Sequence, residues 1–197
     1  MTDPAVGDKS IIVFSEPRDV KGTALLTHTK IEPEDDSQWI FLPAIKRVKR
    51  ISSSNRTGKF VSSEFSYEDL GSEEVMDNEH IWLLDLPCPT DAELTCAKVE
   101  SRPKNPRSGY SKRVSYTDLD QYRVHRIEFY NRRGDLEKIL TFTGFKLYLG
   151  QYWRAHEIEM ENIQTGKSTT LSWNEYKFRV DISERDFTPQ ALERSSR

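Results

Sequence analysis

The residues best suited to chemistry in this sequence are few and poorly placed for catalysis. The run His156-Glu157-Ile158-Glu159-Met160 begins like a zinc-protease motif, but that motif needs a helix and a second histidine where Met160 stands. Glu157 and Glu159 are a carboxylate pair such as glycoside hydrolases use, yet alternation with apolar residues makes them neighbours on one solvated strand face. No phosphate-binding loop, dinucleotide fingerprint or nucleophile elbow occurs either. We therefore expect no catalytic residues, no enzyme activity and no cofactor.

Two cysteines, Cys88 and Cys96, lie eight positions apart on either side of a turn expected at Thr90-Asp91. Cysteines that flank a turn can close a small disulfide in an oxidising compartment, and two free thiols are the alternative. A metal site is not expected, because structural zinc usually takes four ligands and no other cysteine or histidine pair has ligand spacing.

The composition is that of a globular chain with a polar surface. It has 197 residues, of which 36% are hydrophobic and 31% charged, and its formal net charge is -3 at pH 7. This length suits one domain with a real core, and the negative charge argues against a nucleic-acid-binding protein. No apolar run approaches the roughly 18 residues of a membrane-spanning helix, and the first ten residues lack the basic and apolar regions of a signal peptide. We expect a soluble protein that does not span a membrane.

Short runs rich in Val, Ile, Thr and aromatic residues alternate with Gly, Asn, Asp and Pro turns, which is typical of an antiparallel β protein. Helix is scarce: short helical turns are predicted at Ser66–Leu70, where Ser66 and Asp69 have capping-box spacing, and at Thr188–Arg194. The expected strands are Lys9–Phe14, Gly22–Lys30, Gln38–Leu42, Lys46–Ile51, His80–Leu86, Leu94–Ser101, Lys112–Thr117, Val124–Tyr130, Leu136–Phe142, Trp153–Glu161, Ser168–Trp173 and Tyr176–Val180.

Some of these strands are apolar on both sides, whereas others alternate cleanly. A strand that is apolar on both sides must be covered on both. A single antiparallel sheet curled around an apolar interior, partly lidded, satisfies both patterns. Its aromatic and aliphatic side chains either fill the core or line a cavity for a lipid chain. For a lipid-binding cavity, the candidate lining residues are Trp39, Phe41, Leu83, Phe129, Phe142, Ile158, Met160 and Trp173.

The segment Trp39–Leu70 carries the most specific pattern of the chain. Its apolar start ends at Pro43 within WIFLPAIKRVKRI, a serine-rich loop follows, and EFSYEDL closes the segment. This order resembles the LolA-like family of bacterial outer-membrane lipoprotein-sorting proteins. The resemblance implies that residues 1–197 form a single LolA-like half-barrel domain. Its fold would be mainly β, with a strongly curved antiparallel sheet that forms an open half-barrel with short lid helices. The resemblance also implies that the domain works without catalysis in the periplasm. The family pattern also implies leading strands, a helix and an export signal before Asp8, so we expect the chain to lack that N-terminal part, with its signal peptide removed.

The residues and the resemblance together predict a periplasmic carrier or chaperone that binds lipoprotein acyl chains or other lipids and serves outer-membrane lipoprotein sorting. The basic residues Lys46, Arg47, Lys49 and Arg50 would contact lipid headgroups or an acidic partner. The alternative is a non-catalytic envelope interaction domain that docks on an inner-membrane exporter, with the aromatic residues as plain core. The two hypotheses differ in whether the interior is hollow.

Overall fold

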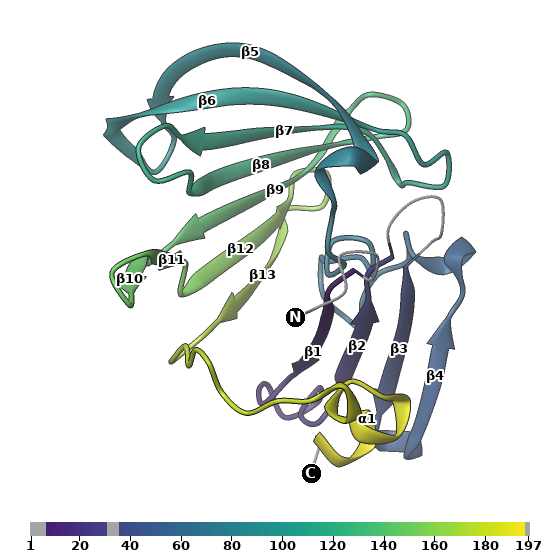
Figure 1. The fold of residues 1–197 in the computed structure, drawn as a ribbon. Helices are drawn as coiled ribbons and strands as arrows, with labels where there is room; N and C mark the ends of the chain where they lie inside the picture. The colour runs from purple at the N-terminus through teal and green to yellow at the C-terminus, as the bar shows by residue number, and fades with distance from the viewer. Residues whose placement is uncertain (1–6, 31–35, 196–197) are drawn as a thin grey trace. The chain divides into compact units, whose positions relative to one another are not determined.

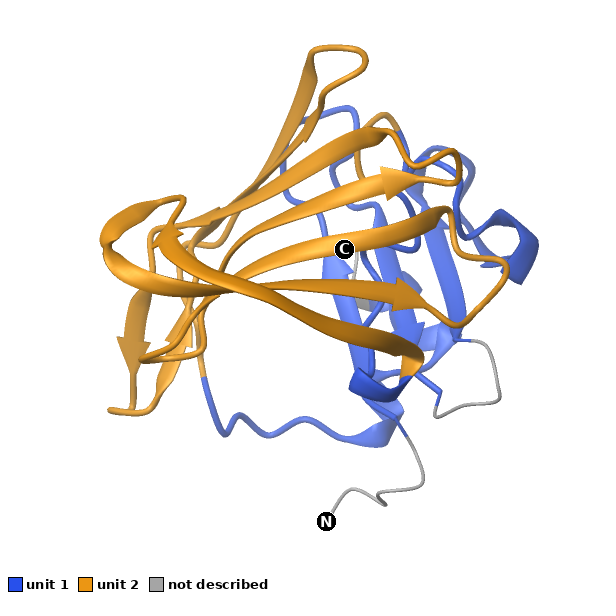
Figure 2. Cartoon of the chain, turned by 90° about the horizontal axis from the view of Figure 1, so that it is seen from above, with its two compact units in different colours: residues 1–61, 66–76, 178–197 blue, residues 62–65, 77–177 orange. Residues whose placement is uncertain are grey.

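A computed structural model describes residues 7–30 and 36–195, which divide into two compact units. Unit 1 comprises Met1–Val61, Ser66–Met76 and Phe178–Arg197, and unit 2 comprises Ser62–Phe65 and Asp77–Lys177 (Figure 2). Both units consist mainly of antiparallel strands with few helices, as the sequence predicts (Figure 1). The expectation of one continuous sheet was wrong, because the strands pair into separate sheets.

Unit 1 contains a four-stranded antiparallel sheet in the order β1-β2-β3-β4. Its strands follow one another in sequence, and each pairs with the next one along the chain. Pro43 begins the connection between β3 and β4, where a proline suits the first position of a short helical turn. The elements are β1 (Lys9–Val13), β2 (Ala24–His28), β3 (Ser37–Leu42), η1 (Pro43–Ile45), β4 (Arg47–Ile51), η2 (Ser53–Asn55), η4 (Glu184–Asp186) and α1 (Pro189–Ser195).

Helix α1 packs on one face of this sheet and confirms the helical turn predicted near Thr188–Arg194. It starts at Pro189, and the hydroxyl of Thr188 accepts a 3.1 Å hydrogen bond from the Ala191 amide, which caps the helix. Leu192 is fully buried in a cluster with Ala24, Leu26 and Phe41. Burying one such leucine contributes about 2 kcal/mol, so the helix is held by packing rather than by its length.

The turn predicted at Ser66–Leu70 forms without becoming a helix. The Ser66 amide donates to the Asp69 carboxylate at 2.7 Å, and the Asp69 amide donates to the Ser66 hydroxyl at 3.2 Å. This is the reciprocal pattern expected from the spacing. The turn stays next to β3, where the Gln38 side-chain amide donates to the Tyr67 carbonyl at 2.9 Å.

Unit 2 contains a seven-stranded antiparallel sheet in the order β13-β12-β9-β8-β7-β6-β5, together with a separate two-stranded β10-β11 hairpin. Turns with left-handed glycines join several strands: Gly134 has φ 89° between β8 and β9, where a side chain would be strained. The short η3 (Val75–Asp77) precedes the first strand. The strands are β5 (Asn78–Cys88), β6 (Asp91–Pro103), β7 (Tyr110–Asp118), β8 (Val124–Asn131), β9 (Leu136–Thr143), β10 (Lys146–Tyr148), β11 (Tyr152–Arg154), β12 (Glu157–Asn162) and β13 (Lys167–Ser172).

Two strand predictions near the C-terminus were wrong. The expected strand Trp153–Glu161 is two strands, β11 and β12, because the chain breaks at His156. The His156 ring is held there by the Tyr148 hydroxyl at 2.7 Å and by the Trp173 carbonyl at 2.7 Å. The expected strand Tyr176–Val180 does not form, and Arg179 adopts a left-handed φ of 55° that interrupts extended backbone.

The one α-helix within residues 7–30 and 36–195 has seven residues, and no helix in these ranges is long and apolar enough to cross a bilayer.

Candidate functional site

An apolar face runs over four neighbouring strands of unit 2. Ile158 of β12 pairs with Phe142 of β9 and with Leu171 of β13, and Met160 pairs with Leu140. Directly paired residues of antiparallel strands point to the same side of a sheet, and so do residues two apart on one strand. The pairing of these strands therefore places side chains from distant parts of the sequence on one side of the sheet. We define the apolar face by Ile127, Phe129, Leu140, Phe142, Ile158, Met160 and Leu171.

The opposite side of the same strands is polar. Glu157, Glu159 and Glu161 alternate with the apolar residues of β12 and are exposed. Within the apolar face, Met160 is fully buried, whereas Phe142 and Ile158 are only partly buried. The alternation that the sequence shows in this strand is therefore the division between a charged side and an apolar side.

Four of the residues predicted to line a lipid cavity lie together on the apolar face, namely Phe129, Phe142, Ile158 and Met160. The other two in unit 2 do not pair within its sheet. Leu83 sits at an irregularity between Trp82 and Leu84 on edge strand β5 and is 42% exposed. Trp173 follows β13, and its amide donates to the His156 carbonyl at 2.8 Å.

The two remaining predicted cavity residues belong to unit 1. Phe41 is buried in the cluster with Leu192 of α1, and Trp39 packs against that cluster. The Trp39 ring also lies 5.0 Å from the His28 ring and 5.8 Å from the Arg50 guanidinium. In unit 1 these aromatic side chains stabilise the contact between sheet and helix.

The predicted basic contact residues lie on and just before β4, an edge strand of the unit 1 sheet. Lys46, Arg47, Lys49 and Arg50 are all exposed. Lys49 pairs with Ile40 and Arg50 pairs with Trp39, so the charges point to both sides of the strand. Charged residues on an edge strand also discourage pairing with another chain.

The EFSYEDL motif contributes directly to unit 2 through Glu64. Its amide donates to the Thr169 hydroxyl at 3.0 Å, and its carboxylate accepts from the Asn162 amide at 3.0 Å. Its carbonyl accepts from the Lys138 ammonium at 3.3 Å. Thr169 pairs with Met160, and Lys138 pairs with Asn162, so all three partners are on the side of the apolar face. The segment Ser62–Phe65 is thereby fixed over the Met160 end of that face.

Comparison with known proteins identifies the family. A protein-family model described as an uncharacterized protein matches residues 7–194. The structure of a candidate outer-membrane lipoprotein-sorting protein domain from Vibrio parahaemolyticus is 43% identical, with a TM-score of 0.90, over 98% of this chain and 80% of that one. The chain belongs to this LolA-like family of lipoprotein-sorting domains.

Two further structures are similar to the LolA-like protein described here. A DUF1329 family protein from Desulfovibrio piger is 28% identical with a TM-score of 0.85, over 93% of this chain and 76% of that one. A LolA superfamily protein from Nitrosomonas europaea is 22% identical with a TM-score of 0.69, over 92% of this chain and 77% of that one, and shows the shared fold. A comparison with curated proteins found no match.

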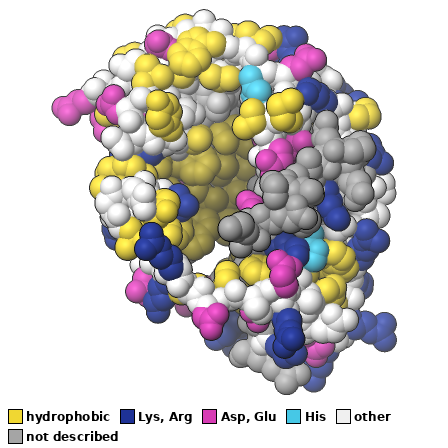
Figure 3. Space-filling view, viewed as in Figure 1, with side chains coloured by type: hydrophobic (Ala, Val, Ile, Leu, Met, Phe, Trp, Pro, Cys, Tyr) yellow, Lys and Arg dark blue, Asp and Glu magenta, His cyan; other side chains and the backbone are white. Residues whose placement is uncertain are grey.

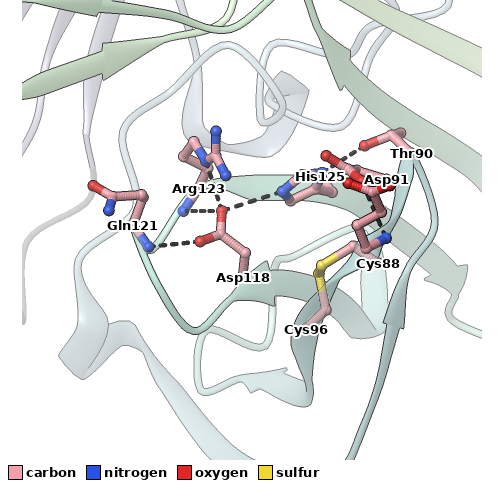
Figure 4. Close-up of a disulfide and its surroundings, with 9 residues drawn as sticks. Cys88, Thr90, Asp91, Cys96, Asp118, Gln121, Arg123 and His125 are labelled. Atoms are coloured by element: carbon pink, nitrogen blue, oxygen red, sulfur yellow. Dashed lines mark hydrogen bonds and ion pairs between the residues drawn. A yellow bond between two sulfur atoms is a disulfide. The ribbon is translucent and has the colours of Figure 1, made fainter.

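The LolA-like chain also contains a buried polar cluster around a disulfide between Cys88 and Cys96 (Figure 4). Asp118 is 1% exposed and accepts hydrogen bonds from the Gln121 amide at 2.6 Å and the Arg123 guanidinium at 2.7 Å. The His125 ring contacts it at 3.2 Å through Nε2. Burial by itself would raise the pKa of Asp118, but these hydrogen bonds outweigh it and lower the pKa to about 2.

Sequence reasoning missed this cluster because its members come from separate strands. Cys96 of β6 pairs with Asp118 of β7, and His125 belongs to β8. The local signal was limited to a histidine and an aspartate seven positions apart. Only strand pairing brings them beside the cysteines.

Proposed function

We propose that this LolA-like protein is a periplasmic carrier that binds lipoprotein acyl chains or another lipid on the apolar face of unit 2. The observation that carries the proposal is the register of β8, β9, β12 and β13, which aligns seven apolar side chains on one side and glutamates on the other. Each buried methylene of a lipid contributes about 0.8 kcal/mol, so ten buried methylenes contribute about 8 kcal/mol without any specific polar contact.

We also propose that the antiparallel strands form an open half-barrel with short lid helices and that residues 1–197 act as one domain. The exposed basic residues Lys46, Arg47, Lys49 and Arg50 would contact lipid headgroups or an acidic partner. Membership of the lipoprotein-sorting family supports a role in outer-membrane lipoprotein sorting, and a disulfide suits an oxidising periplasm.

One observation favours the second candidate function, a domain that docks on a membrane exporter. Edge strand β5 exposes Ile81, Trp82, Leu83 and Leu84 by 42 to 59%. Hydrophobic side chains are visible over this part of unit 2 in the space-filling view (Figure 3). An exposed apolar edge strand can pair with a partner strand, which would not require a hollow interior.

The first experiment is native mass spectrometry of the purified protein, followed by solvent extraction and lipid analysis of anything released. Bound phospholipid or acyl-chain mass supports the carrier. A bare mass, together with failure to take up a fluorescent fatty acid, supports the docking domain instead.

A matched pair of variants tests the apolar face itself. Ile158→Glu places a carboxylate on the apolar face, and Thr170→Glu places one on the opposite side, since Thr170 pairs with Glu159. We expect Ile158→Glu to weaken fatty-acid binding at least about tenfold, which corresponds to about 1.4 kcal/mol, because the charge must be buried against the acyl chain. Thr170→Glu should bind as the wild type does. Equal binding by all three proteins would place the lipid elsewhere.

A further inference from the structure

The Cys88–Cys96 disulfide lies beside a buried histidine, His125. Both sulfurs and one ring nitrogen of His125 lie within 4.8 Å of one another, and all three residues are buried. In a tetrahedral zinc site, ligand atoms lie about 3.3 to 3.8 Å apart, given bond lengths of about 2.0 to 2.3 Å. Small shifts of the side chains would therefore bring the three ligand atoms to coordination distance.

We propose that the reduced, dithiol form of this protein binds a thiophilic divalent cation such as Zn²⁺ through Cys88, Cys96 and His125. The disulfide form does not bind it, because thiolates rather than disulfide sulfurs are the ligands. The site is thus a metal site that opens only when the disulfide is reduced.

The sheet keeps the three ligands in place after the disulfide breaks. Cys88 ends β5, Cys96 lies within β6, and His125 lies near the start of β8. Cys96 pairs with Leu86 on one side and with Asp118 on the other. Cys88 and Cys96 also pack in a cluster with Val114 and Tyr116. Backbone pairing and packing therefore position the ligands independently of the bond between the sulfurs.

Both ring nitrogens of His125 have a hydrogen-bond partner, and a metal ion would replace the partner at Nδ1. A carboxylate only accepts hydrogen bonds, so the Nε2 atom of His125, 3.2 Å away, donates to Asp118. The other ring nitrogen, Nδ1, lies 2.5 Å from the Thr90 hydroxyl oxygen (Figure 4). A carboxylate that holds the far nitrogen of a ligating histidine is the usual support of a zinc site. Thr90 itself is exposed.

Metal binding would take two steps, reduction of the disulfide and binding of Zn²⁺ to the thiolates. A dithiol donor reduces the disulfide: the bond between the sulfurs of Cys88 and Cys96 breaks, two thiols form, and the donor becomes a disulfide. Zn²⁺ then replaces the two thiol protons, which leave to solvent. Two thiolates and one Zn²⁺ sum to no net charge, which suits a buried site. Three protein ligands leave a fourth position for water or a small ligand.

The test compares oxidised and reduced full-length protein. The protein is reduced with a phosphine without oxygen, loaded with Zn²⁺, freed of excess metal and analysed for zinc content. We expect about one zinc per reduced chain and none per oxidised chain. X-ray absorption at the zinc edge should show two sulfur ligands and an imidazole, and Co²⁺ in place of zinc should show thiolate charge-transfer bands.

Variants separate the ligands from their surroundings. Cys88→Ser/Cys96→Ser should bind no zinc, His125→Gln should lose the imidazole signal, and Asp118→Asn should bind about 10- to 100-fold more weakly. The matched control is His156→Gln, which alters a different, partly buried imidazole of unit 2 and should bind as the wild type does. The proposal fails if reduced wild type with a native circular dichroism spectrum takes up no zinc, or if its absorption spectrum lacks sulfur or imidazole ligands. The absorption spectrum of the wild type decides the outcome even where a variant does not fold.

Discussion

Asp118 should make the stability of this LolA-like protein depend on pH in the acidic range. Its side chain is fully buried and binds Gln121, Arg123 and His125 (Figure 4). Its pKa falls from 3.8 to about 2 in the folded protein, and at 1.36 kcal/mol per pH unit the ionised carboxylate stabilises the fold by about 2 kcal/mol.

The sign follows from the lowered pKa. A carboxyl that is more acidic when folded stabilises the protein above its unfolded pKa near 4, and this contribution is lost as the pH falls toward 2. Asp118→Asn keeps the size of the side chain but removes the charge. The difference in free energy of unfolding between wild type and Asp118→Asn should therefore shrink by about 2 kcal/mol between pH 7 and pH 2.

Urea unfolding at several pH values, followed by circular dichroism, measures this difference. Glu157→Gln is the matched control, because Glu157 is exposed on the polar side of the same sheet, and it should change stability by no more than about 0.5 kcal/mol. A difference between wild type and Asp118→Asn that stays constant from pH 7 to pH 2 would refute the assignment of this acid dependence to Asp118.

Three other variants test what stabilises unit 2. Glu64→Ala should destabilise unit 2 by about 1 to 3 kcal/mol, because the buried Asn162 amide loses its acceptor. Denaturant unfolding measures this change, and an unchanged midpoint would show that Glu64 does not anchor its segment to Asn162. Gly134→Ala should lower the free energy of unfolding by about 1 kcal/mol, because alanine is strained at a φ of 89°. Nothing lies within 4 Å of the added methyl group, so backbone strain is the cause. Thermal unfolding should show a lower midpoint. Cys88→Ser/Cys96→Ser should lower the free energy of unfolding by about 2.5 kcal/mol, because the unfolded chain is no longer restrained by a disulfide between residues eight positions apart. Equal stability of the oxidised and reduced wild type would contradict this.

Much of the β architecture could be predicted because turn residues and strand alternation are local. Gly134 and Gly166 mark turns where they have left-handed backbone, and the Ser66 and Asp69 spacing predicted a reciprocal capping pattern. The prediction failed at His156, where side-chain hydrogen bonds to Tyr148 and to the Trp173 carbonyl break a strand that looked continuous. Those partners are 8 and 17 positions away in the sequence, beyond any local pattern.

The sequence by itself determined which side chains of each strand share a face, because successive residues of a strand alternate. It therefore placed Ile158 and Met160 opposite Glu157 and Glu159, and it named the LolA-like family from the segment Trp39–Leu70. Only the tertiary structure decided which strands pair. Pairing aligned Phe142 with Ile158, left Phe41 in contact with a helix, and brought His125 beside Cys88 and Cys96. These contacts join residues far apart in the chain, and their energy depends on register and burial, which local sequence does not encode.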